Sequence, residues 1–572
     1  MSFLKELRFL RFSIPVLLIT LGVISNDVSA QSQQEQSKYL EAVQTFADNV
    51  RSEGRDTYGE IHSPLFADGI HAITKEPVTW KHEKGEWIIS NFGSQQNLIR
   101  TLVGLTELTG DQSYKRSAAE AVQYMFDHQS DEVGLLYWGG HQFVDLATME
   151  NQFKGRPHEL KNNFPFYEFM WEVDSVSTRK MLRAMWNAHI LNWDKLDLNR
   201  HGEYDSEMGK LWSHDFHQPK PFFESEGLTF INAGTDMVQS ALALYHLGSK
   251  EGAKTWGIRL YEQYVKARHP ETNLGVYQYS RPKKDKDPPV DGPLVGELTF
   301  SSYGDRAQNQ FGKKYGDVAL EGNVLWGGRM ETLYGKSPVM ILHLAEQLEG
   351  SRAGEQLLEW VLSGLKAYSK YAYVPEENHY KPMWADGTDL SGHVMPRTGY
   401  YGEKGTKFKP LKPNGDMMLA LAKSVRLSEG NTVLWNTFRH QFKGIDFGDP
   451  GKEWESKPEL NLETTNADPK MLVMVLEIYK GTKIPQFLKL AERIGDNILQ
   501  EKYHKGYFRP SEKHRYIKFD SPEPLALLML EEARQGSFGK VPPYVTGYGS
   551  TDGEPSLDGR PTDETYYEET FD

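Results

Sequence analysis

Paired helical segments recur along this chain and constrain its fold more than any other feature. In each pair an apolar segment with residues three or four apart stops at a glycine, a few polar residues turn the chain, and an amphipathic segment follows. The pairs span residues 97–108 and 113–128, 230–247 and 251–268, 337–348 and 353–371, 415–427 and 432–442, and 467–479 and 484–503. This repeat predicts helical hairpins set around one axis, as a closed α/α toroid or an open solenoid.

Two further segments bear on whether the ring closes. Residues 174–191 are predicted to be another first helix, with a short partner near residues 206–212. Residues 521–535 are predicted to be a last helix, and residues 36–51 are the partner that we expect for it. This pairing of the two ends favours closure. The predicted fold is therefore all-α, a toroid of about seven helical hairpins.

The two ends of the chain differ from the helical region. A positively charged head, a short apolar run and small residues at a cleavage position predict a secretory signal peptide over residues 1–30. The apolar run, residues 12–24, is shorter than the ~20 residues that span a bilayer. Residues 31–535 then form a single helical domain, and residues 536–572, rich in Gly, Pro and acids, are predicted to be a loosely ordered tail.

Charge and cysteine content exclude several classes of protein. The formal net charge is -14, whereas a nucleic-acid-binding protein would be expected to be basic. No later stretch is apolar enough for a membrane helix, so we expect an exported chain with no membrane contact once the signal peptide is removed. There is no cysteine, so the fold has no disulfides and any metal must be bound through nitrogen and oxygen.

Long connections between the hairpins carry the candidate chemistry. They are rich in Gly, Pro, Trp, Tyr and His and cover residues 138–165, 195–226, 273–328, 374–413 and 447–463. Loops of this length in a compact protein are usually functional. We therefore expect one end of the toroid to be the working face, with short strands in its loops, for example at residues 275–280 and 301–310.

Three loop positions combine residues of metal-ligand type with a cation. His141 follows two glycines that permit close approach of the backbone, and Glu159 precedes an aromatic run. Arg200 directly precedes His201. Each residue alone is more often a structural loop residue. Together, two imidazoles and a carboxylate can hold a divalent cation beside an arginine.

These motifs resemble the pectate lyases of polysaccharide lyase family 2. The resemblance is carried by LLYWGGHQFVDL (135–146), HELKNNFPFYEFMWEVD (158–174), MWNAHILNW (185–193), NRHGEYD (199–205) and SSYGDRAQNQFG (301–312). It is strong over residues 134–205 and extends through weaker signals over about 58–533. It implies an (α/α)7 barrel with His141, Glu159 and His201 as metal ligands and Arg200 as catalytic base.

The resemblance also implies a substrate and a cofactor. The substrate is polygalacturonate (pectate) or its oligomers, cleaved by β-elimination: a base removes the C5 proton, the C4 oxygen leaves, and a 4,5-unsaturated galacturonate end forms. The ion is Mn²⁺ or another transition metal. Two imidazoles and a carboxylate suit Mn²⁺, Co²⁺, Ni²⁺ or Zn²⁺, whereas Ca²⁺ prefers six to eight oxygens. A role in trimming imported oligosaccharides favours the periplasm over secretion.

Further side chains are candidates for gripping the sugar chain or for replacing Arg200. A guanidinium can bind a uronate carboxylate bidentately, and aromatic rings can stack on sugar faces. Arg306 is the first choice; a structural ion pair explains Arg329 and Arg397 equally well, and packing explains the aromatic residues at least as well. The candidates are Arg306, Arg329 and Arg397 for the carboxylates, Trp171, Trp384 and Tyr400 for the sugar faces, and His158 and His189 as alternative bases.

Two other functions remain open at this point. A glycoside hydrolase on an α/α barrel would need two carboxylates ~5–10 Å apart, and the acids available include Asp205, Asp236, Asp305 and Glu321. A non-catalytic oligogalacturonide-binding protein would need only cations and aromatic rings. The absorbance of an unsaturated uronate would separate a lyase from both.

Overall fold

The computed structural model describes residues 37–82, 85–152, 157–222, 224–281, 306–311, 314–315, 318–547, 551 and 566–571. The signal peptide predicted for residues 1–30 lies outside these residues and stays a prediction. The chain from Lys38 onward forms one compact unit. None of the helices in its described part is long and apolar enough to cross a bilayer.

An inner ring of helices is formed by the first member of each hairpin. Its members are α2 (Gln96–Thr109), α4 (Tyr167–Val173), α6 (Ile231–Gly248), α10 (Ser337–Gln347), α12 (Gly415–Leu427), α14 (Pro469–Thr482) and α16 (Glu523–Arg534). Successive helices pack together from α4 to α16, and α16 packs on α2. The ring is completed where the Phe166 N–H, at the start of α4, donates to Gln96 Oε1 of α2 (2.8 Å).

An outer layer of amphipathic helices covers this ring. It contains α3 (Gln112–His128), α5 (Ser175–His189), α7 (Glu251–Lys266), α11 (Arg352–Tyr371), α13 (Thr432–Gly444), α15 (Pro485–Lys502) and α1 (Lys38–Glu53). Position in the ring explains the sequence pattern. Every residue from Ile231 to Leu244 of α6 is buried, because the helix is contacted on all sides, whereas α3 buries a single stripe.

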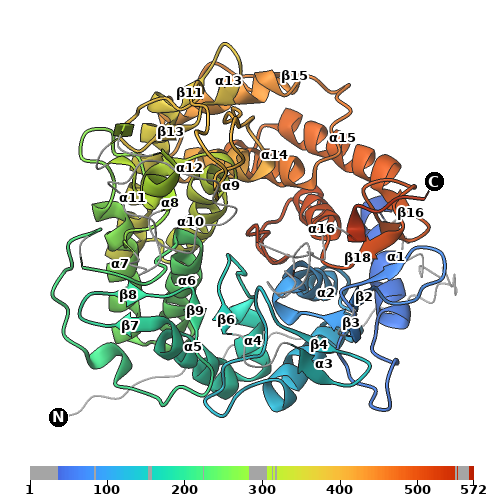
Figure 1. The fold of residues 1–572 in the computed structure, drawn as a ribbon. Helices are drawn as coiled ribbons and strands as arrows, with labels where there is room; N and C mark the ends of the chain where they lie inside the picture. Colours follow the sequence, from blue (N-terminus) through green and yellow to red (C-terminus); the bar gives the residue numbers. More distant parts are fainter. Residues whose placement is uncertain are drawn as a thin grey trace, which may run out of the picture. The chain divides into compact units, whose positions relative to one another are not determined.

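The first and last helices of the described chain lie side by side. α1 packs on α16, and Figure 1 shows the blue N-terminal helix next to the red C-terminal one. The predicted closed all-α toroid is therefore confirmed. The predicted glycine stop is observed after α2: Gly110 adopts φ 79°, its N–H bonds to the Thr106 carbonyl, and Asp111 caps α3. Two other stops differ, because α6 and α14 include Gly248 and Gly481 and the left-handed caps that follow are Ser249 and Lys483.

One hairpin was predicted in the wrong order. Residues 174–191 are not a first helix, because they form the outer helix α5, and the inner partner is the short α4 before it. Asp174 separates the two, since its extended backbone ends α4 and its carboxylate accepts the Val176 and Ser177 N–H groups. Near residues 206–212 there is only the 3₁₀ turn Leu211–Ser213.

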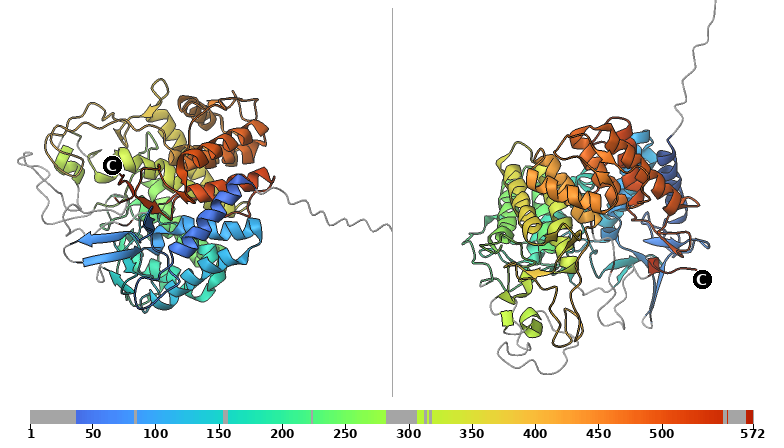
Figure 2. Two further views of the ribbon diagram at one scale, coloured as in Figure 1. Left: turned by 90° about the vertical axis from the view of Figure 1, so that its right-hand side faces the viewer. Right: turned by 90° about the horizontal axis from the view of Figure 1, so that it is seen from above.

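Short antiparallel strands occupy the long loops, and Figure 2 shows them gathered at one end of the helical ring. The largest sheet has the order β2 (Thr79–His82), β3 (Gly85–Ser90), β4 (Phe143–Asp145), β5 (Glu150–Gln152). The strand pairs are β1 (Gly69–His71) with β18 (Tyr516–Lys518), β6 (His158–Glu159) with β9 (His201–Gly202), β7 (Ile190–Asn192) with β8 (Asp197–Leu198), β10 (Val324–Leu325) with β13 (Met383–Trp384), β11 (Tyr373–Val374) with β12 (His379–Tyr380), β14 (Gly448–Asp449) with β15 (Glu459–Leu460), and β16 (Tyr503–His504) with β17 (Tyr507–Phe508).

Two loop predictions and the tail prediction need correction. Residues 306–310, expected in a strand, belong to the helix α8 (Arg306–Phe311), and residues 275–280 contain only an isolated bridge from Gln278 to Phe230. A second short helix, α9 (Gly327–Glu331), follows in the same loop region. The tail was predicted to be loosely ordered, yet among its described residues, 536–547, 551 and 566–571, the following are buried: Val541, Tyr544, Val545, Thr546, Thr551 and Tyr567. The rest of the tail lies outside the described residues, and there the prediction stays open.

Candidate active site

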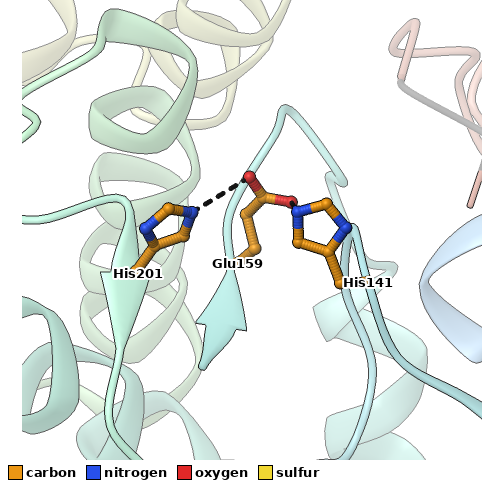
Figure 3. A group of neighbouring side chains, drawn as sticks. All are labelled: His141, Glu159 and His201. Atoms are coloured by element: carbon orange, nitrogen blue, oxygen red, sulfur yellow. Dashed lines mark hydrogen bonds and ion pairs between the residues drawn. The ribbon is translucent and has the colours of Figure 1, made fainter. Parts of the chain in front are cut away.

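Two imidazoles and one carboxylate converge at the strand-bearing end of the ring. One potential ligand atom from each of His141, Glu159 and His201 lies within 4.8 Å of the others. The Nε2 atoms of His141 and His201 are each 3.2 Å from an oxygen of Glu159, one on Oε2 and the other on Oε1. Figure 3 shows the two rings on opposite sides of this carboxylate.

Backbone pairing explains why these residues meet. In the β6–β9 ladder Glu159 is directly opposite His201, so the two side chains share one face. Gly139 forms a parallel bridge with Glu159 at φ 127°, a conformation that favours glycine. A Cβ at Gly140 would lie 1.9 Å from Glu159 Oε2. The two glycines therefore let the His141 loop approach the carboxylate.

Glu159 is 1% exposed and is surrounded by cationic groups. The Arg200 guanidinium contacts Oε1, and Lys161 Nζ is 2.9 Å from Oε2. A buried carboxylate needs such compensation. The sequence motif predicted Arg200 at this position but did not single out Lys161, which lies two residues beyond Glu159 and returns to the same face of the strand.

The two histidines considered as alternative bases lie on the other face. His158 alternates with Glu159 along β6, and its Nδ1 is 2.8 Å from His189 Nε2. His189 Nδ1 is 2.8 Å from the Asn199 carbonyl, which only accepts, so His189 donates to it and its Nε2 accepts from His158. Burial lowers the pKa of both, to about 4 for His189. They are a neutral pair that supports β9 rather than groups facing the site.

A second cluster joins two arginines, a glutamate and a tyrosine. Buried Glu321 accepts from Arg306 Nε (2.7 Å) and Arg329 Nη2 (3.1 Å). The Tyr400 ring is 39% exposed and lies 3.5 Å from the Arg306 guanidinium carbon. Burial raises the pKa of Tyr400, but Arg329 and Arg306 outweigh it and the net shift is downward. The arginines are buried and paired, so Tyr400 is the exposed surface of this cluster.

Two aromatic rings connect this cluster to the first. The guanidinium carbon of Arg200 is 5.5 Å from the Phe230 ring centre, and Phe230 is 5.1 Å from Tyr277. Tyr277 in turn lies 4.8 Å from Arg329. Two adjacent rings thus link the Arg200 guanidinium of the first cluster to the Arg329 guanidinium of the second. Phe230 and Tyr277 were not among the sequence candidates, since neither carries a charge or a motif that distinguishes it from core aromatics.

Two predicted sugar-stacking residues are contradicted by their positions. Trp384 is fully buried on β13, against Phe311 and within a core cluster, so no face of it is available. Trp171 lies where a Cβ on Gly248 would touch it, at the C-terminal end of α6. The 18 residues of α6 separate that end from Phe230 by about 27 Å at 1.5 Å per residue.

The remaining candidates have mainly structural contacts. The Arg397 side chain is buried, and its carbonyl accepts from Gln310 Nε2 (3.0 Å). Asp236, one of the acids available to a hydrolase, is fully buried at the start of α6 and accepts the Asn162 and Phe164 N–H groups. Burial raises its pKa to about 7. It fixes the loop that follows Glu159.

Comparison with known proteins gives a consistent assignment. The model of a family described as periplasmic pectate lyase matches residues 63–554. The pectate disaccharide-lyase of Dickeya dadantii is 33% identical over 552 residues, which cover 94% of this chain and 96% of that relative. Among solved structures, the GH76 α-mannanase of Bacteroides thetaiotaomicron matches with a TM-score of 0.41 at 7% identity, over 87% of this chain and 96% of its own. Cellobiose 2-epimerase from Bacillus thermoamylovorans matches with a TM-score of 0.39 at 11% identity, over 86% and 99%. The family match and the sequence relative both extend over most of the chain, which belongs to the periplasmic pectate lyase family.

Proposed function

We propose that this lyase cleaves pectate or oligogalacturonides by metal-assisted β-elimination, with His141, Glu159 and His201 holding the ion. The observation that carries the proposal is the convergence of these three side chains within 4.8 Å. The glycine cradle at Gly139 and Gly140 also fits, because it leaves room beside the carboxylate that no larger residue would leave. Family membership supports the reaction class.

The donor set narrows the metal. Two nitrogens and one carboxylate suit first-row transition metals, and we propose Mn²⁺, with Co²⁺, Ni²⁺ or Zn²⁺ as substitutes and Ca²⁺ disfavoured. When bound, the ion would stabilise the negative charge that develops on the uronate carboxylate as the C5 proton leaves.

Arg200 is proposed as the base. Its guanidinium is beside Glu159 and over the Phe230 ring, with Lys161 on the other carboxylate oxygen. The role follows from the resemblance of the motif NRHGEYD (199–205), which contains this arginine. Transfer of the C5 proton to Arg200 leaves the electron pair to form the C4–C5 double bond as the C4 oxygen departs. No water is consumed.

The row of rings and cations beyond Arg200 is proposed to bind the sugar chain. The exposed Tyr400 ring offers a stacking face, and Arg306 and Arg329 behind it add positive charge. Arg397 is retained as a weaker candidate in the same region, through its contact with Gln310. We also propose export to the periplasm, in keeping with the description of the family.

The test is digestion of defined oligogalacturonides by chelator-treated protein, with and without added Mn²⁺, followed by ultraviolet absorbance and mass. We expect new absorbance and products with an unsaturated end only when metal is present. Products that have gained water without new absorbance would indicate a hydrolase. Saturable binding with no products over a long incubation would indicate a binding protein.

A further inference from the structure

The C-terminal segment passes through the middle of the helical ring. α16 starts at the same end as α2, because Asp520 just before it accepts the Asn97 N–H (2.6 Å), and it ends on the opposite side. After the turn at Gly536, the Lys540 N–H donates back to the Glu532 carboxylate (2.6 Å). The chain therefore re-enters the ring from the end opposite the candidate active site.

Distances along α2 show that this segment is extended. A Cβ added at Gly104 would lie 3.2 Å from Val541 Cγ1 and 3.3 Å from Pro542 Cδ, whereas Thr546 shares a small cavity with Gln96. From Gly104 back to Gln96 is about 12 Å of helix. The four residue-to-residue steps from Pro542 to Thr546 cover at most about 14 Å when fully extended. The segment thus runs nearly straight, antiparallel to α2, and its two prolines favour that conformation.

Contacts on several sides place the segment within the ring. Opposite α2, Thr546 Oγ1 donates to Asp416 Oδ1 at the start of α12 (2.7 Å). Lys470 of α14 donates to the other oxygen of Asp416 (2.9 Å). Thr546 is buried, as are Val541 and Val545. A segment held by α2, α12 and α16 at once has little freedom to shift along the axis.

The far end of this segment reaches both loops of the candidate metal centre. A Cβ on Gly547 would lie 3.5 Å from the Asn162 carbonyl, in the loop after Glu159. Thr551 Oγ1 accepts from Asn91 Nδ2 (2.7 Å), and the same amide nitrogen donates to the Gly139 carbonyl (2.9 Å). One amide group therefore joins the tail to the glycine loop that brings His141 to Glu159.

We propose that residues 537–547 and 551 act as an internal strut, and that Thr551 is a positioning residue that sets the approach of the His141 loop to Glu159 and hence the affinity for metal. The inference rests on the proposed function, in that these residues hold the ion. Asn91 and Thr551 are both buried, so removing the Thr551 hydroxyl leaves a buried N–H of the Asn91 side chain without its acceptor. The Asn91 amide must then shift to find another acceptor, and the Gly139 loop bonded to it shifts as well. Mutation of residues that hold metal ligands in place typically lowers metal affinity 10–100-fold.

The test compares Thr551→Val, which keeps the shape and removes the acceptor, with Thr551→Ser, which keeps the acceptor. Mn²⁺ affinity is measured by calorimetric titration of metal-free protein. We expect Thr551→Val to bind about 10-fold more weakly and Thr551→Ser to bind like wild type. Elimination by Thr551→Val should recover at saturating Mn²⁺. Thr178→Val, a buried threonine of α5 whose hydroxyl donates to the Asp174 carbonyl, is the matched control and should not change Mn²⁺ affinity.

Two further variants separate the possible failures. If His141→Ala binds Mn²⁺ as wild type does, the proposed metal site is wrong, whatever Thr551 does. If His141→Ala loses the metal and Thr551→Val retains full affinity, only the strut is wrong. If Thr551→Val fails to fold, Thr546→Val tests the same strut, because it removes the hydrogen bond between the strut and Asp416 of α12. Wild-type Mn²⁺ affinity in that variant would overturn the strut, and weakened affinity would support it.

Discussion

Gly140 gives the sharpest test of the metal centre, through the change Gly140→Ala. The added Cβ would lie 1.9 Å from Glu159 Oε2 and 2.8 Å from Lys161 Nζ, whereas real Cβ contacts are not found below 3.0 Å. The carboxylate must therefore move by at least about 1.1 Å. The loop cannot simply retreat, because Gly139 is bridged to Glu159 and bonded to Asn91. Metal sites tolerate deviations of about 0.2 Å in ligand distance.

A displacement several times larger than that tolerance should remove Glu159 as a ligand. We expect Mn²⁺ affinity to fall at least about 100-fold, or about 2.7 kcal/mol, in calorimetric titration of metal-free protein. Gly392→Ala is the control, because that glycine is exposed and its added Cβ meets nothing within 4 Å. Wild-type affinity and activity in Gly140→Ala, with the fold intact, would refute the proposed role of this carboxylate.

Three further predictions concern the base, the second cluster and a buried acid. Arg200→Ala and Arg200→Lys should lower kcat about 10²–10⁴-fold. Mn²⁺ should bind to Arg200→Ala as well as to wild type or better, because the guanidinium no longer competes for Glu159. Near-normal elimination in both variants would exclude Arg200 as the base. Glu321→Gln leaves Arg306 and Arg329 buried without their carboxylate and should cost about 3–5 kcal/mol in urea unfolding, with Mn²⁺ affinity unchanged. Asp236 has its pKa raised to about 7, so its contribution to stability is present at low pH and is lost between about pH 4 and 7. Between about pH 4 and 7 the free energy of unfolding should therefore fall less in Asp236→Asn than in wild type, and the difference should reach up to roughly 4 kcal/mol. The same pH slope in both proteins would contradict the raised pKa of Asp236.

The local spacing of apolar residues predicts the ring of helices but does not reveal its shortest helix, α4. Helices such as α6 and α11 extend over about five to six turns, so their apolar spacing is visible in the sequence. α4 has seven residues and fits within one aromatic run, so no period can be read from it. The longer α5 was therefore assigned to the inner position that α4 fills.

The residues of the candidate centre were predicted as a set because of the motifs around them, not because of their spacing. Nothing in the separation of Glu159 from His201 shows that they are opposite in a two-residue ladder. Tyr277 enters the site through tertiary contacts alone, whereas Lys161 is only two residues beyond Glu159 but carries no motif that marks it. Trp384 has the composition of a sugar platform, but its burial depends on packing of α8, which a local pattern does not reveal.

The buried tail follows from the geometry of a ring. Seven inner helices among the described residues, spaced about 10 Å apart, would leave a hole about 13 Å wide once the helices themselves are subtracted. Inward side chains narrow this hole, and an extended strand can occupy it, as Val541–Thr546 does beside α2. The composition of residues 536–572 predicts disorder because it supplies too few apolar groups to build a core of its own. A segment that enters an existing core needs only a few apolar side chains. Its polar groups form hydrogen bonds with Asp416, Glu532 and Asn91. Composition therefore misjudged the described part of this tail, because two of these partners, Asp416 and Asn91, lie 130 and 460 residues before the threonines that they contact. Contacts over such distances make the segment suited to couple the closure of the ring to the metal-binding loops.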